Sequence, residues 1–193
     1  AANDDWIVVA RLIDFPVFII AGVNSQIKSV ADLRGKTIGV PFGGGPHPYI
    51  INQLQQNNLS FRGRNPDSFL LNIKPPELPF AMEQRSVDAI AGWDPVTTII
   101  LQKKLGLVID ENRQSSLITI RRSVAEANHD NVVKVLKALI LAQLYLNQHR
   151  ELGDSWFSNY SHVSVELIKQ GKIIEANFKA KKLSEIDLSL SPQ

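Results

Sequence analysis

The chain has 193 residues, of which 44% are apolar, so it can fill the core of one ordinary domain or of two small lobes. Lysine and arginine number 21 against 19 acidic residues, and no run of like charges could follow a nucleic-acid backbone. The sequence holds no cysteine, which excludes disulfides, thiolate metal sites and thiol nucleophiles. These features predict a folded chain with no nucleic-acid partner.

The histidines offer little chemistry for a metal site or an enzyme. None of the four has a histidine four residues away, and no G-x-S-x-G sequence is present. We therefore expect no metal, no cofactor and no catalytic residue. The most apolar long segment, residues 132–146, is interrupted by Lys134, Lys137 and Gln143, so it predicts a buried helix and not a membrane span.

Strands and helices alternate through the first two thirds of the chain, which predicts an α/β fold with a mainly parallel sheet. The apolar runs predict strands at residues 6–10, 17–22, 38–40, 69–73, 87–92, 107–109 and 117–120. Between them, helices are expected at residues 29–35, 46–57, 75–85 and 94–104. The remainder predicts only helices, at 130–149, 151–159 and from about 164.

Residues 37–50 are the most informative segment, because a short strand runs into three glycines and then into a helix opened by Pro46. The backbone N–H groups of Gly43, Gly44 and Gly45 could converge on a small anion, which the positive end of the helix dipole would also attract. The segment matches neither G-x-x-x-x-G-K-[ST] nor G-x-G-x-x-G, the two glycine patterns typical of nucleotide-phosphate binding. The alternative is an ordinary connector between a strand and a helix.

His47 lies in the first turn of that helix, where the dipole favours a neutral imidazole that donates a hydrogen bond. The alternative is a histidine that faces solvent. Trp93 and Asp94 follow a predicted strand, at the sheet edge where open α/β proteins bind ligands. Trp93 could form an apolar wall or pack in the core, whereas Asp94 is more typical of a helix N-cap. Phe15 could face a cleft or the core.

Three segments, residues 27–36, 43–47 and 87–95, resemble in order the solute-binding proteins of ABC importers for sulfonates, taurine, nitrate and thiamine-pyrimidine precursors, the NMT1/THI5-like family. The resemblance implies a type II periplasmic-binding-protein-like fold, a two-lobe sandwich with a helical C-terminal tail and an incomplete N-terminal lobe. It implies that residues 1–25 end lobe one and make the first crossing, that 36–115 form lobe two, and that 116–193 return to lobe one.

The resemblance also implies a function, namely capture of a small anion by closure of two lobes. Gly43, Gly44, Gly45 and His47 match the part of the family site that holds the anionic head, although this corner lacks the family's serine. The implied partners are a small-molecule anion and the ABC permease of the inner membrane. The implied location is periplasmic or extracytoplasmic, reached through a leader outside these residues. A ligand sensor or a menaquinone-pathway enzyme on the same scaffold are the alternatives.

Overall fold

The computed structural model describes residues 5–171 and 174–175. The chain forms two compact units. We call residues 16–114 and 166–172 the sheet unit, and residues 1–15, 115–165 and 173–193 the helical unit. The sheet unit contains the predicted glycine corner, so its construction decides where the candidate site lies. The predicted lobe boundaries differ from these units, since residues 166–172 group with the sheet unit, and the lobes remain a prediction.

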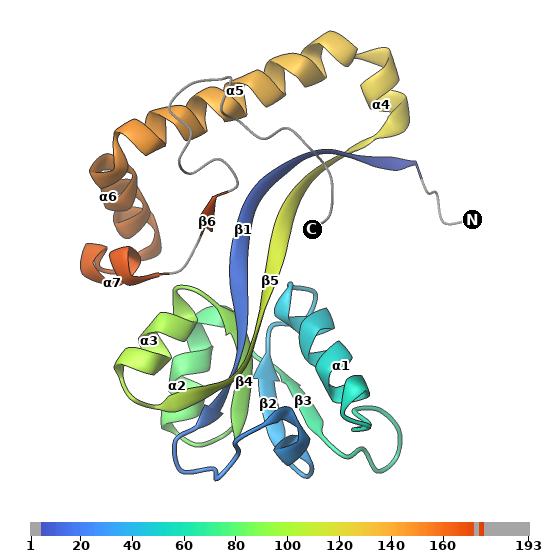
Figure 1. Ribbon diagram of the computed structural model, residues 1–193, viewed down its shortest axis with the longest axis vertical. Helices are drawn as coiled ribbons and strands as arrows, with labels where there is room; N and C mark the ends of the chain where they lie inside the picture. Colours follow the sequence, from blue (N-terminus) through green and yellow to red (C-terminus); the bar gives the residue numbers. More distant parts are fainter. Residues whose placement is uncertain (1–4, 172–173, 176–193) are drawn as a thin grey trace. The chain divides into compact units, whose positions relative to one another are not determined.

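A mixed sheet forms the centre of the sheet unit (Figure 1). The strand order is β3-β2-β4-β1-β5, and β6 pairs with β1. Its strands are β1 (Trp6–Gly22), β2 (Thr37–Val40), β3 (Phe69–Asn72), β4 (Ala89–Trp93), β5 (Gly106–Arg121) and β6 (Ile174–Glu175). Strand β2 is parallel to β3 and β4, whereas β1 is antiparallel to β4. The α/β prediction is confirmed, but the expected mainly parallel sheet is wrong, because the long β1 runs against its neighbour.

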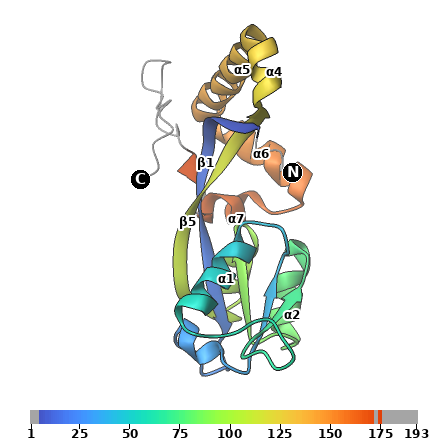
Figure 2. The ribbon, with the colours of Figure 1, turned by 90° about the vertical axis from the view of Figure 1, so that its right-hand side faces the viewer.

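The helices follow the predicted order. In the sheet unit they are η1 (Val30–Leu33), α1 (Pro46–Gln56), η2 (Pro75–Glu77), α2 (Leu78–Glu83) and α3 (Val96–Gln102). The later helices are α4 (Arg122–Ala127), α5 (His129–Gln148), α6 (Arg150–Ser161) and α7 (Val165–Gln170). Helix α1 covers one face of the sheet, and α2 with α3 covers the other (Figures 1 and 2). Two-sided cover of this kind buries the central strands.

A capping box starts η1, as the sequence predicts. The carboxylate of Asp32 accepts hydrogen bonds from the backbone N–H groups of Lys28 and Ser29, at 3.0 and 2.9 Å, and from the Ser29 hydroxyl. The N–H of Lys28 and the two groups of Ser29 lower the pKa of Asp32. Gly35 then ends the turn with a φ of 76°, in the left-handed region that glycine favours.

Strands β1 and β5 are each continuous, although two separate strands were predicted in each segment. The predicted breaks fall on charged and polar residues, which remain in the strands because they find partners. Asp14 pairs with Arg11 at 3.5 Å and accepts a hydrogen bond from Ser115 at 2.6 Å. A paired polar side chain costs little in a half-buried strand, so the interruption in hydrophobicity does not interrupt the backbone.

The described core lies in the sheet unit. Ile20, Leu78, Ile90 and Ile100 are fully buried within one apolar cluster. In contrast, α5 has no buried residue, so the expectation of a buried helix at residues 132–146 is wrong, and Leu141 is 61% exposed. Among the described residues, no helix combines the length and hydropathy that a bilayer crossing requires.

Candidate functional site

The glycine corner connects the end of β2 to the start of α1, and two of its three amides already have acceptors. The Gly44 N–H donates to the carbonyl of Pro41 at 3.3 Å, and the Gly43 N–H faces Nδ1 of His47 at 3.4 Å. Among the described residues, the Gly45 N–H has no acceptor. The amide nest of three converging N–H groups is therefore reduced to one open backbone donor in this structure.

Trp93 lies beside this corner. A side chain at Gly44 would place its Cβ 3.3 Å from the edge of the indole ring, so the ring and the glycine are in contact. Both residues sit at the carboxyl ends of the parallel strands β2 and β4, where ligands bind in open α/β sheets. The structure thus brings together two of the sequence-predicted site residues.

His47 is half-buried in the first turn of α1. Its ring stacks on Phe42, with centroids 4.3 Å apart and planes inclined by 10°. An Nδ1 that accepts from Gly43 requires a neutral ring with its proton on Nε2. That tautomer carries its donor at Nε2, and the role of His47 in binding an anion remains a prediction.

Asp94 has a structural role at the start of α3. Its Oδ1 accepts hydrogen bonds from the Thr97 hydroxyl at 2.5 Å, from the Thr98 hydroxyl at 2.6 Å and from the Thr98 N–H at 3.2 Å. Asp94 is only 5% exposed. These bonds satisfy donors in the first turn of α3, although the N-cap residue is Pro95, one position after the predicted Asp94.

Phe15 lies on β1 in the helical unit, whereas the other candidate site residues belong to the sheet unit. Its side chain is half-buried. The role of Phe15 in a cleft remains a prediction.

Two contacts between β5 and α1 were not foreseen. The Tyr49 hydroxyl donates to Oδ2 of Asp110 at 2.5 Å, and Nε2 of Gln114 donates to the carbonyl of Gly45 at 2.9 Å. Both bonds join residues more than sixty positions apart. Asp110 and Gln114 are four residues apart on a strand and so lie on the same side of it. Through them, β5 fixes the start of α1 and the end of the corner.

Burial, and then the hydrogen bond and charge of Asp110, raise the pKa of Tyr49. Because this folded-state pKa lies above that of the unfolded chain, Tyr49 contributes stability that is complete below pH ~10 and is lost as the pH rises further. We expect alkaline titration of folded protein to give less tyrosinate absorbance than denatured protein, and Tyr49→Phe to remove that difference. Equal absorbance in the folded and denatured wild type would contradict the buried pair.

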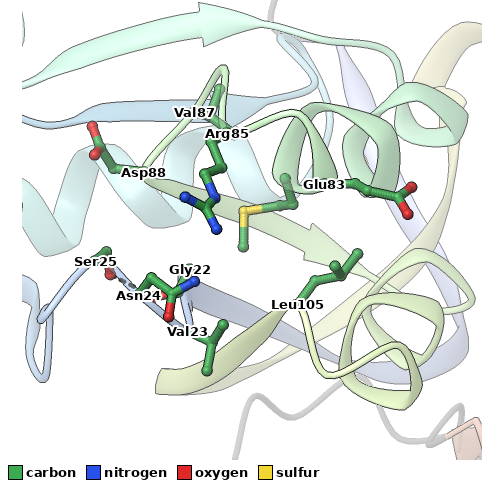
Figure 3. Close-up of a pocket in the computed structure, with 10 residues that line it drawn as sticks. Gly22, Val23, Asn24, Ser25, Glu83, Arg85, Val87, Asp88 and Leu105 are labelled. Atoms are coloured by element: carbon green, nitrogen blue, oxygen red, sulfur yellow. Dashed lines mark hydrogen bonds between the residues drawn. The ribbon is translucent and has the colours of Figure 1, made fainter.

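Among the cavities lined by described residues, two lie in the sheet unit. One, of about 300 Å³, is lined by Phe18, Asp94, Thr97 and residues of α3 and α7. The other, of about 260 Å³, lies where β4 begins, at the opposite end of that strand from Trp93 (Figure 3). Its lining includes Met82 and Leu105, and the guanidinium of Arg85 points toward Asn24. The first cavity, but not the second, shares the carboxyl edge of β4 with the corner.

Comparisons with known proteins define the family. Residues 20–154, more than half of the chain, match the model of the NMT1-like family, and the chain belongs to that family. It is 30% identical over 137 residues to a protein of Escherichia coli (strain K12) named for binding aliphatic sulfonates. It is 24% identical over 156 residues to a protein of Bacillus subtilis (strain 168) with the same name. The resemblance drawn from the sequence is confirmed.

These matches cover 69% and 78% of this chain but only 42% and 46% of the two relatives, so the chain spans less than half of their length. The fold is also similar to solved structures. The periplasmic aliphatic sulphonate binding protein SsuA from Escherichia coli gives a TM-score of 0.70 at 24% identity, covering 88% of this chain and 59% of that one.

The periplasmic nitrate-binding protein NrtA from Synechocystis PCC 6803 gives a TM-score of 0.63 at 14% identity, covering 84% of this chain and 47% of that one. The desulfurization enzyme DszB gives a TM-score of 0.59 at 16% identity, and the match covers 92% of this chain and 66% of the DszB chain. The predicted periplasmic-binding-protein-like fold is thus confirmed. Binding proteins and an enzyme share it, so the fold alone does not decide between them.

Proposed function

We propose that this chain is part of the solute-binding component of an ABC import system, and that its ligand is a small aliphatic sulfonate. Support comes from the family, from two relatives named for such ligands, and from the contact between Trp93 and the glycine corner. The corner offers uncharged donors to the anionic head, namely the Gly45 N–H and the Nε2–H of His47. The indole ring of Trp93 provides an apolar wall for an alkyl group.

The Trp93 contact is the observation that favours a sulfonate over nitrate. Nitrate has no apolar part, so an indole ring beside the anion site adds nothing specific to its binding. An alkyl chain gains about 0.8 kcal/mol for each methylene group that it buries. We therefore expect a longer aliphatic sulfonate to bind more tightly than a shorter one, and both to bind more tightly than nitrate.

The proposal includes the mode of action and the partner. Ligand bound by two lobes would stabilise the closed arrangement by its higher affinity for that arrangement, and the closed arrangement would be presented to a permease. Such a protein works outside the cytoplasmic membrane. The same cleft could instead report ligand to a sensory partner, which gene neighbours would reveal as a kinase or cyclase in place of a permease.

We further propose that the protein is not an enzyme. The structural relative DszB is an enzyme, and one of its solved structures, a variant in which serine replaces a cysteine, holds biphenyl-2-sulfinic acid. The present sequence contains no cysteine, so it lacks a thiol that could serve as a nucleophile. Among the described residues, no group of three or more potential metal ligands is present either.

Tryptophan fluorescence tests the proposed site directly. The chain has three tryptophans, and Trp93 is in contact with the corner. We expect butanesulfonate to change the fluorescence of the wild type and of Trp156→Phe, a matched control at an exposed position of the helical unit. The Trp93→Phe variant should lose the signal. A signal that persists in Trp93→Phe, or a wild type that responds to sodium chloride as it does to the sulfonate, would contradict the proposal.

A further inference from the structure

The side chain of Gln114, on β5, is in close contact with the glycine corner. Its Nε2 donates to the carbonyl of Gly45 at 2.9 Å. Its Oε1 lies so close that a Cβ added to Gly45 would meet it well inside 3.0 Å, a separation that real Cβ atoms essentially never show. The carboxamide of Gln114 therefore occupies the space that a side chain at position 45 would need.

The contact with Gln114, and not the backbone conformation, is what a side chain at position 45 would disturb. The φ of −53° and ψ of −44° of Gly45 are ordinary helical values that any residue can adopt. Gly43 is the opposite case, because its φ of 81° favours glycine although no atom lies within 4 Å of its added Cβ. Glycine at position 43 is favoured by the backbone, whereas a side chain at position 45 would have to displace the terminal carboxamide of Gln114.

The carboxamide has a further donor to offer. Its Nε2 carries two hydrogens, and among the described residues only the carbonyl of Gly45 accepts one of them. The Gly45 N–H is likewise without an acceptor in the described part of the chain. The second contact between the same elements, from Tyr49 to Asp110, holds β5 against α1 and so fixes the position of Gln114.

We propose that Gln114 is a specificity-determining residue of the anion site, which supplies an uncharged N–H donor beside Gly45. The proposal rests on the proposed function and deepens it. Together with Gly45 and His47, Gln114 would bind the oxyanion through neutral donors only, without an ion pair. Such a donor set suits a singly charged sulfonate, because neutral donors can bind its oxygens through charge-assisted hydrogen bonds without adding a full positive charge to the site.

Four variants test the proposal by titration calorimetry with butanesulfonate. We expect Gln114→Ala to lose about tenfold to a hundredfold in affinity. Gly45→Ala should lose a similar factor, because its new methyl group displaces the carboxamide. The double variant should be no worse than either single one, since both changes remove the same contact. Asn72→Ala is the matched control, because its Oδ1 accepts the Phe42 N–H at 3.0 Å at the other end of the corner, away from Gly45.

Gln114→Glu separates a ligand contact from simple support of the loop. The carboxylate has the same shape but repels an anion, so we expect a larger loss than in Gln114→Ala. Affinity should recover on acidification toward the pKa of a glutamate, about 4.3. His47 and Asp110 also lie near the corner and can titrate, so the comparison is made with Gln114→Ala at each pH.

The outcomes distinguish the inference from the function that it rests on. A wild type that binds no sulfonate would overturn both. A wild type that binds, with Gln114→Ala unchanged, would overturn only the role of Gln114. An equal loss in Asn72→Ala would show that Gln114 merely supports the loop, as would a Gln114→Glu variant that behaves as Gln114→Ala at every pH. If the loss of binding free energy in the double variant equals the sum of the losses in the two single variants, the two residues do not share one contact at Gly45.

Discussion

Replacing Asp94 with alanine is expected to lower the free energy of unfolding by about 3 kcal/mol. The carboxylate accepts three hydrogen bonds through Oδ1, and one of the donors, the Thr97 hydroxyl, is on a fully buried side chain. Alanine leaves that hydroxyl without its carboxylate acceptor in the interior and also removes the acceptor of the Thr98 N–H in the first turn of α3. Urea denaturation of the purified chain measures the loss.

Asp94→Asn is the matched control for this prediction. Asparagine keeps an oxygen acceptor at the same position, so we expect it to retain most of the stability that alanine loses. A loss below about 1 kcal/mol in Asp94→Ala would show that solvent or another group replaces the carboxylate. It would also weaken the structural role that we assign to this residue beside Trp93.

A second large effect is expected at Gly106, where β5 begins. A Cβ at this position would lie 2.6 Å from the carbonyl oxygen of Ala21 and 2.6 Å from Cγ2 of Ile20. The oxygen belongs to the backbone of a buried strand and cannot move without disturbing the sheet. We therefore expect Gly106→Ala to cost about 3 kcal/mol of stability, the upper part of the usual range for overpacking a core.

The control for Gly106 is Gly63→Ala. Gly63 has a φ of 103° but no atom within 4 Å of an added Cβ, so its substitution costs only backbone strain, about 1 kcal/mol. Thermal or urea unfolding of both variants under the same conditions decides the comparison. If the two variants lose the same free energy of unfolding, the space around Gly106 between β5 and β1 can accept a methyl group, contrary to the prediction.

Local signals made much of the sheet unit predictable from the sequence. The capping box of Ser29 and Asp32, the proline at the start of α1 and the glycine corner each depend on neighbouring residues, and the structure forms all three. Alternation of apolar runs and helical segments indicated the α/β class. Asp94 was expected to begin α3, and its carboxylate does accept the Thr98 N–H, but the N-cap residue is Pro95, one position later.

The parts that the sequence did not predict depend on contacts between distant residues. Asp110 and Gln114 lie in a polar stretch that breaks the hydrophobic pattern of β5, so they suggest a loop and not a strand. Their partners, Tyr49 and Gly45, are more than sixty residues away. Nothing in the local pattern marks either pair. The acceptors for the amides of Gly43 and Gly44, in contrast, are local, namely His47 and Pro41, and were missed because the nest prediction left these amides open.

The central claim is that an anion binds at the corner through Gly45, with Trp93 beside it. A two-dimensional ¹H–¹⁵N NMR titration of the 193-residue chain with butanesulfonate tests it most directly, since backbone amides, side-chain amides and the indole N–H are all observed. We expect the largest shifts at the Gly45 amide, the Gln114 side chain and the Trp93 indole, and none of them with sodium chloride. Shifts confined to the cavity around Arg85, or no shifts specific to the sulfonate, would contradict the claim.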